Sequence, residues 1–199
     1  METDPRTERI LEVAIELAEQ EGYEAVRLRD LAAKADVALG TVYRRFSSKE
    51  DILAAVLERE VQRLSDGLGE AGVPGETVGE RLNTFFGMAT RFLVARPNLA
   101  RALLRAVASG VPDIAEKVTR YHGNMAGIIV GVVRGEPVRD DAAWPTPNER
   151  TLAALLQQAW FAVLVGWSGG LQDVDEALAD MEVAVRVLLH GITVLEEDP

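Results

Sequence analysis

The residues best suited to a chemical task are cations and hydroxyls gathered in one short stretch, residues 27–49. This stretch holds six Lys or Arg against two Asp, whereas residues 1–26 hold two Arg against eight Asp or Glu, and residues 50–199 hold 13 basic against 22 acidic residues. A basic patch in a chain of net charge −11 indicates a local surface for phosphate groups. The residues predicted to meet a DNA duplex are Arg27, Leu39, Gly40, Thr41, Tyr43, Arg44, Arg45 and Lys49.

Each of these residue types has its own contact to make at a duplex. The hydroxyls of Thr41 and Tyr43 can donate to phosphate oxygens, and the tyrosine ring can lie against a sugar or a thymine methyl. Arg44 and Arg45 can neutralise phosphate, and either can bind guanine through two N–H groups. Lys49 lies in the first turn of a predicted helix, where its charge opposes the helix dipole and a bound anion would compensate.

A helix-turn-helix over residues 27–46 is the element that would position these side chains. Asp36 falls at the turn, since aspartate tolerates a left-handed backbone, and Gly40 lets the start of the second helix (residues 38–46) approach DNA closely. Arg27 stands at the N-cap of the first helix, where it cannot cap through a side-chain oxygen and can instead reach a phosphate. The apolar positions that hold the two helices together are Leu28, Leu31, Ala32, Val37, Val42 and Phe46.

The rest of the chain is also predicted to be helical, because apolar residues recur at spacings of three and four. A helix before the basic patch ends at Gly22, a C-cap residue, and Ser47 with Glu50 predicts a capping box that opens the helix after it. The sequence therefore predicts an all-α protein of about nine helices in two parts, residues 1–50 and residues 51–199. The later helices are expected at about residues 77–95, 98–109, 113–134, 149–167 and 174–195.

The end of the helix-turn-helix carries a recognisable motif. Residues 40–50, GTVYRRFSSKE, resemble the signature G-T-x-Y-x-x-F-x-x-K-E of the tetracycline-repressor (TetR) family of transcriptional regulators, and residues 22–25 are similar to the family's end of the first helix. The resemblance implies a homodimer that binds a palindromic operator in double-stranded DNA through residues 1–50, a three-helix domain. It also implies a ligand-binding and dimerisation domain in residues 51–199. Arg27 departs from the pattern, because the family usually has Ser or Thr there.

A narrower resemblance is to the repressors of steroid and cholesterol catabolism, the KstR type. It is carried by residues 22–26 with 35–38, residues 81–83 with 96–99, and residues 159–160 with Trp167 and 184–189. This resemblance implies a small apolar effector that releases the repressor from its operator. The effector would be a steroid- or lipid-derived acid or its CoA thioester.

Large apolar side chains on the later helices should surround the centre of the second part of the chain. Such a centre would suit an apolar ligand, although a packed core gives the same pattern. A few polar side chains among them would orient the polar end of a ligand. The candidate ligand-binding residues are Asn83, Phe86, Phe92, Tyr121, His122, Met125, Gln157 and Trp160.

The last two expected helices each carry an apolar stripe. Paired with their two-fold copies they would make a four-helix bundle, which sets the distance between recognition helices at about 34–36 Å or a multiple. A ligand that favours a different spacing would weaken DNA binding. The residues predicted at the dimer interface are Leu155, Ala159, Ala162, Gly166, Met181, Val185 and Leu188.

Other classes of function find little support in the sequence. There is no cysteine, and the two histidines, His122 and His190, have no metal-binding spacing, so we expect no metal, no cofactor and no enzyme. The acidic N-terminus lacks an apolar segment and the apolar run at residues 159–167 is short, which favours a cytoplasmic protein outside the membrane. Two alternatives stay open: a ligand-dependent activator or co-repressor-type regulator of the same fold, and a helical binding module without DNA function.

Overall fold

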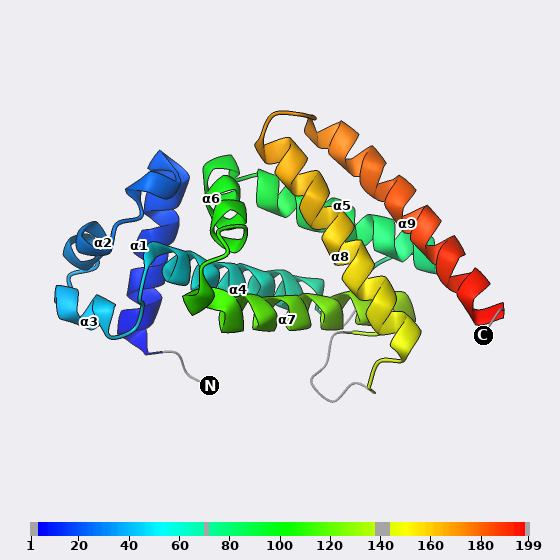
Figure 1. Ribbon diagram of the computed structural model, residues 1–199, viewed down its shortest axis with the longest axis horizontal. Helices are drawn as coiled ribbons and strands as arrows, with labels where there is room; N and C mark the ends of the chain where they lie inside the picture. The colour runs from blue at the N-terminus through cyan, green and yellow to red at the C-terminus, as the bar shows by residue number, and fades with distance from the viewer. Residues whose placement is uncertain (1–3, 70–71, 138–143, 198–199) are drawn as a thin grey trace. The chain divides into compact units, whose positions relative to one another are not determined.

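The computed structural model describes residues 4–69, 72–137 and 144–197. Within this part of the chain the secondary structure is helical, with nine α-helices, two short 3-10 turns and no strand, which confirms the predicted all-α class. The elements in chain order are α1 (Pro5–Glu21), η1 (Tyr23–Ala25), α2 (Leu28–Lys34), α3 (Leu39–Tyr43), α4 (Lys49–Leu68), α5 (Val78–Val94), α6 (Pro97–Val107), η2 (Pro112–Ile114), α7 (Ala115–Arg134), α8 (Pro147–Ser168) and α9 (Val174–Glu197) (Figure 1).

The helices group into two compact units. The first is made of Met1–Glu60 and Ala95–Tyr121, and the second of Val61–Val94 and His122–Pro199. The first unit therefore contains α1, α2, α3 and α6. Two boundaries fall inside α4 and α7, and the third falls between α5 and α6. These units are defined by packing, and the domain boundary predicted after residue 50 stays a prediction.

The first helix, α1, begins and ends at the residues that the sequence provides as caps. Asp4 is the N-cap, and its carboxylate accepts a hydrogen bond from the backbone N–H of Arg6 at 3.0 Å, while Pro5 fills the first helical position. Gly22 ends the helix with a φ of +81°, which glycine adopts without strain. Apolar residues spaced by three and four form its inner face, and their side chains are at most 3% exposed: Ile10, Val13, Ala14, Leu17 and Ala18.

The turn between α2 and α3 has the backbone that the sequence predicts. Asp36 has a φ of +54° and so lies in the left-handed region. The third helix is shorter than the predicted residues 38–46, since it spans Leu39–Tyr43 alone. A turn follows, in which the N–H of Phe46 donates to the carbonyl oxygen of Val42 at 2.9 Å, and the Phe46 ring, 4% exposed, enters the core.

The N-terminus of α4 is capped one residue later than predicted. The hydroxyl of Ser48 accepts the N–H of Asp51 at 3.1 Å, and the Asp51 carboxylate accepts the N–H of Ser47 at 2.8 Å. The predicted box of Ser47 with Glu50 is therefore wrong. Glu50 does not cap the helix because of a tertiary contact, in which its carboxylate accepts a hydrogen bond from the Tyr23 hydroxyl.

In the second unit, α9 packs along α8 and against α5 (Figure 1). Where α5 meets α8, the ring of Phe86 lies edge-on to Phe85 at 5.1 Å and tilted against Trp160 at 5.8 Å, between centroids. The indole N–H of Trp160 donates to the hydroxyl of Thr90 at 2.9 Å, and both side chains are buried. This bond satisfies the polar atom of an otherwise apolar packing site.

A bidentate ion pair joins the end of α7 to the start of α8. Arg134 Nε and Nη2 donate to the two carboxylate oxygens of Glu149 at 2.7 and 2.8 Å. Glu149 also completes a capping box with Thr146. The hydrogen bond from Arg134, followed by those from Thr146, lowers the pKa of Glu149 to about 2.

By length and composition alone, α8 could cross a membrane, since its mean hydropathy reaches 1.3. The sequence suggested only the shorter run at residues 159–167. In the structure Leu152, Leu156 and Trp160 of this helix are at most 5% exposed, and the helix lies against α9. One face of the helix is thus buried inside the folded unit, while Leu155 and Val165 on the same helix are exposed.

Candidate nucleic-acid interface

The short helix α3 presents most of the predicted DNA contacts to the outside. Val42 is completely buried and so fixes which side of the helix faces the core, while Tyr43, on the other side, is 59% exposed. A Cβ on Gly40 would meet nothing within 4 Å in the described part of the chain, so the start of α3 is open to a close approach. Among the other predicted contacts, Arg44 and Arg45 are exposed, and Leu39 and Thr41 are half-buried.

The two arginines after α3 are already held by hydrogen bonds within the chain. Arg44 Nη2 donates to the hydroxyl of Thr41 at 3.1 Å. Arg45 Nη1 donates to the hydroxyl of Thr7 at 2.8 Å, and its Nη2 is ion-paired with Asp4 at the start of α1. A phosphate that binds Arg45 would therefore compete with Asp4.

Lys49 is likewise engaged. Its ammonium lies 3.0 Å from a carboxylate oxygen of Glu24 and 3.9 Å from the centroid of the Tyr23 ring. The hydrogen bond from Lys49 is the main cause that holds the pKa of Glu24 below its usual value. The positive charge in the first turn of α4 is thus compensated by an acidic side chain of η1, where the sequence predicted an anion.

Sequence reasoning did not identify the side chains that surround Lys49. Tyr23 and Glu24 entered only as part of a family motif, and Glu50 only as a helix cap, while Arg105 was not considered. Burial, followed by the hydrogen bond to Glu50, raises the pKa of Tyr23 to about 12. The partners come from η1, α4 and α6, so no local spacing in the sequence could have brought them together.

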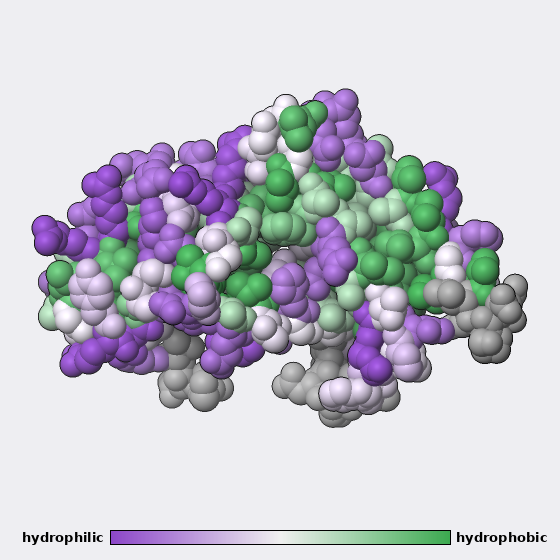
Figure 2. Space-filling model, in the orientation of Figure 1, coloured by the Kyte–Doolittle hydropathy of each residue, from purple (hydrophilic) through white to green (hydrophobic). Residues whose placement is uncertain are grey.

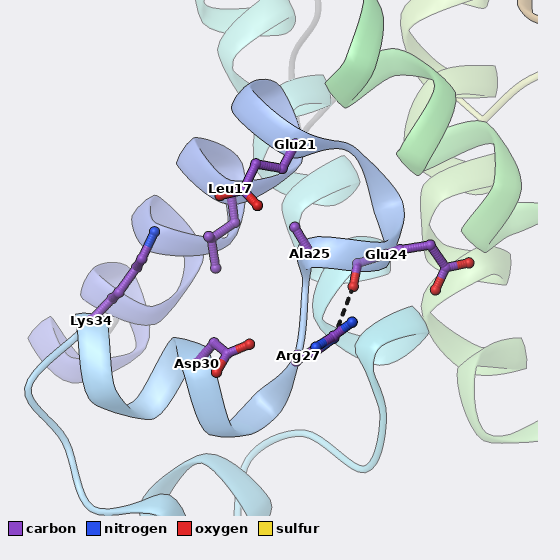
Figure 3. Close-up of a pocket in the computed structure, with 7 residues that line it drawn as sticks. All are labelled: Leu17, Glu21, Glu24, Ala25, Arg27, Asp30 and Lys34. Atoms are coloured by element: carbon purple, nitrogen blue, oxygen red, sulfur yellow. Dashed lines mark hydrogen bonds between the residues drawn. The ribbon is translucent and has the colours of Figure 1, made fainter.

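Arg27 is the N-cap of α2 and makes no side-chain capping bond within the described chain, as expected. Its Nε donates instead to the carbonyl oxygen of Glu24 at 3.2 Å, which Figure 3 marks with a dashed line. Arg27, Asp30 and Lys34 line a surface hollow next to η1 (Figure 3). Arg27 is therefore exposed beside η1, and its contact with phosphate stays a prediction.

The second unit brings several of the predicted ligand-binding residues into its interior. Phe86, Met125 and Trp160 are at most 5% exposed, and Gln157 is 4% exposed. Gln157 Nε2 and Asn83 Oδ1 are buried and have no hydrogen-bond partner among the described residues. A buried polar atom without a partner costs about 1–3 kcal/mol, so both atoms would gain from a polar ligand group.

Asn83 and Phe86 also line a cavity of about 70 Å³ between α5 and α9. The other lining side chains include the charged Arg91 and Glu182. Drug-sized ligands occupy roughly 300–1,000 Å³. An effector of that size would therefore require the surrounding side chains to move.

Three predicted ligand-binding residues lie elsewhere. Phe92 is 38% exposed and His122 is also exposed, so neither side chain faces the interior of the second unit. Tyr121 is buried but belongs to the first unit. Phe92 was predicted from the apolar pattern of its helix, and Tyr121 and His122 as polar groups that orient a ligand. Neither argument tells which face of a helix is enclosed, so their contact with a ligand stays a prediction.

The residues of the predicted dimer stripe differ in their burial within the chain, and their role at an interface stays a prediction. Met181 and Val185 are 2% and 1% exposed, so α9 turns them toward its own chain. A Cβ on Gly166 would lie 3.3 Å from the side chain of Gln172, so this glycine serves a close contact within the chain. Among the remaining predicted residues, Leu155 and Ala162 are exposed, and Ala159 and Leu188 are half-buried.

The exposed apolar residues on the last two helices include one predicted residue, Leu155, and three others. Val183 and Val187 of α9 are 47% and 61% exposed, and Leu155 and Val165 of α8 are 40% and 42% exposed. Figure 2 shows hydrophobic surface over these two helices. Contiguous exposed apolar surface of this kind commonly marks an interface.

Comparison with known proteins identifies the class. Residues 10–56 match the model of the bacterial regulatory proteins of the tetR family, and residues 75–188 match the model of the tetracyclin repressor-like C-terminal domain. The chain therefore belongs to the TetR family of transcriptional regulators.

Individual relatives narrow this class. The HTH-type transcriptional repressor KstR of Mycobacterium tuberculosis is 30% identical over 185 residues, which cover 92% of this chain and 80% of KstR. The crystal structure of a TetR regulator from Rhodococcus sp. RHA1 superposes with a TM-score of 0.82 at 27% identity, over 92% of this chain and 95% of its own. FadR of Bacillus subtilis, solved with stearoyl-CoA, shares the fold with a TM-score of 0.61 at 19% identity, over 91% of this chain and 96% of its own. Both resemblances seen in the sequence are confirmed.

Proposed function

We propose that this protein is a ligand-responsive transcriptional repressor that binds a palindromic operator in the cytoplasm as a homodimer. The observation that carries the proposal is the exposed face of α3, on a helix-turn-helix with the predicted turn, in a chain similar over 92% of its length to a transcriptional repressor. In this proposal residues 1–50 bind DNA, and residues 51–199 bind the effector and the second subunit.

The DNA contacts divide by chemistry. Tyr43 and Gly40 occupy the open side of α3 and would enter the major groove. The cations would neutralise phosphates, and each phosphate contact makes the slope of log K against log salt steeper by about 0.9. The full set proposed at the interface is Arg27, Leu39, Gly40, Thr41, Tyr43, Arg44, Arg45 and Lys49.

The homodimer is proposed to form through the exposed apolar residues of α8 and α9. Leu155, Val165, Val183 and Val187 would pair with their two-fold copies and so remove apolar surface from water. The dimer would hold two copies of α3 at the spacing of two half-sites. It is therefore part of how the protein would read DNA.

The effector is proposed to bind inside the second unit. Apolar Phe86, Met125 and Trp160 would enclose its body, while Gln157 Nε2 would donate to an acceptor and Asn83 Oδ1 would accept from a donor. An apolar molecule with a small polar group fits this chemistry. A steroid- or lipid-derived acid, or its CoA thioester, is proposed because the sequence resembles the KstR-type repressors of steroid and cholesterol catabolism, and because FadR, which shares the fold, was solved with stearoyl-CoA.

Selection from a library of random duplexes, followed by fluorescence anisotropy on an enriched duplex, tests the DNA function. We expect a palindromic consensus, and binding that weakens as salt rises. The variant Tyr43→Ala with Lys49→Ala should lose at least tenfold in affinity, whereas the control Arg150→Ala on α8 should keep it. Enrichment of no sequence would instead favour a helical binding module without DNA function.

Titration of the bound duplex with stearoyl-CoA or a steroid-derived CoA thioester tests the sign of regulation. Release of DNA supports a repressor that its effector removes from the operator. Tighter binding would favour the co-repressor-type alternative, and reporter expression with the operator upstream of a promoter would separate repression from activation.

A further inference from the structure

Three separate segments of the first unit meet around one tyrosine ring. The ring belongs to Tyr23 of η1, and its hydroxyl donates to Glu50 of α4, which fixes its position. The ammonium of Lys49 lies 3.9 Å from the ring centroid, and the guanidinium carbon of Arg105, from α6, lies 4.1 Å from it. Both cations are within the range of a cation–π contact.

The same two cations share one carboxylate. Glu24 places one oxygen 3.0 Å from Lys49 Nζ and the other 2.9 Å from Arg105 Nη2. Lys49 and Arg105 therefore compete for the single negative charge of Glu24, and a change that strengthens one ion pair weakens the other. The side chains of Glu24 and Arg105 are 66% and 60% exposed, so these pairs are weak enough to exchange.

We propose that Arg105 is a positioning residue that controls how freely Lys49 can bind a DNA phosphate, through competition for Glu24. This inference rests on the proposed role of Lys49 as a phosphate contact. With Arg105 in place, Glu24 is shared and Lys49 can exchange its partner for a phosphate. When Arg105 is withdrawn, Glu24 binds Lys49 alone and competes with DNA.

Arg105 lies on a different helix from the two residues whose contact it affects. It is in the last turn of α6, and α6 packs on α1 and η1 in the first unit. A small displacement of α6 within this unit would therefore break the 2.9 Å contact of Arg105 with Glu24 and leave Glu24 to Lys49 alone.

A double-mutant cycle on DNA affinity tests the proposal in the full-length protein. Glu24→Gln should tighten binding about two- to fivefold, the range expected for the loss of one exposed competing ion pair. Arg105→Gln should weaken binding by a similar factor. In the Glu24→Gln background, Arg105→Gln should have no effect, because there is no carboxylate left to compete for.

Two results would overturn the proposal. If Arg105→Gln weakens binding equally in both backgrounds, Arg105 acts only through the general positive field. If Glu24→Gln weakens binding, Glu24 supports the interface and does not compete with phosphate. Circular dichroism and thermal unfolding check that each variant keeps the fold.

A second measurement, without DNA, separates failure of this inference from failure of the proposed DNA contact. Nitrogen-15 NMR of the lysine ammonium groups should show a less mobile Lys49 in Arg105→Gln and a more mobile one in Glu24→Gln. If these changes appear but Lys49→Gln leaves DNA affinity unaltered, the DNA contact of Lys49 is wrong. If Lys49→Gln weakens binding but the mobility of Lys49 does not respond to Arg105, the competition is wrong.

Discussion

Replacement of Gln157 by methionine should stabilise the ligand-free protein. Gln157 is 4% exposed, and its Nε2 has no hydrogen-bond partner among the described residues. Leaving such a donor unsatisfied costs about 1–3 kcal/mol. Methionine has a similar length and no N–H to satisfy, so it should fill the same space without that cost.

The size of the effect can be stated as a melting temperature. For a chain of this size, about 1 kcal/mol corresponds to roughly 2–4 °C, so a gain of about 2 kcal/mol should raise Tm by roughly 4–8 °C. Thermal unfolding of protein refolded after removal of bound lipids measures it. The matched control is Gln158→Met, because Gln158 is exposed on the same helix and should change stability by no more than about 0.5 kcal/mol.

The opposite result is equally informative. If Gln157→Met lowers Tm, then Nε2 has a partner in the ligand-free protein, and the argument that it awaits a ligand acceptor fails. A second arm adds stearoyl-CoA as a probe. A ligand at 100 times its Kd stabilises a protein by about 2.7 kcal/mol, and this gain should shrink in Gln157→Met but persist in Gln158→Met.

Three further predictions concern stability and assembly. Glu149→Gln should lower the free energy of unfolding, measured by denaturant titration, by about 1–2 kcal/mol at neutral pH. Because the pKa of Glu149 falls from 4.5 to about 2 on folding, this difference from the wild type should persist above pH 4.5 and vanish as the pH drops toward 2. Trp160→Phe should cost about 1–3 kcal/mol in the same assay, since the buried hydroxyl of Thr90 loses its donor; an unchanged midpoint would contradict this. Val187→Glu should convert the dimer to a monomer in light scattering while Leu171→Glu, 85% exposed outside the stripe, should not; a dimer that survives Val187→Glu would place the interface elsewhere.

Much of the fold follows from local patterns, and these were predictable. The apolar face of α1, the left-handed backbone at Gly22 and Asp36, and the order of the helices depend on residues within one or two turns of each other. The helix-turn-helix is specified in the same way, because the buried positions around Val42 and Phe46 leave Tyr43 on the outside. Local spacing and backbone preference suffice for features of this kind.

Contacts between distant segments were decided by the tertiary structure. The cap of α4 moved to Ser48 because Tyr23 takes the carboxylate of Glu50, and Lys49 is compensated by Glu24. Because η1 and α4 are far apart in the chain, no local residue spacing predicts that they contact each other. A charge pattern shows that a cation needs a partner but does not say which one.

In the last helix, α9, the sequence determines the helical pattern, but the tertiary structure determines which residues are buried. Its sequence alone determines an amphipathic α-helix, and apolar residues at Met181 and Val185 repeat with the helical period as well as those at Val183 and Val187 do. Only the packing of α5 and α8 against α9 decides that the first pair is buried and the second exposed. Periodicity fixes which residues share a face, whereas burial depends on the surface that another helix provides.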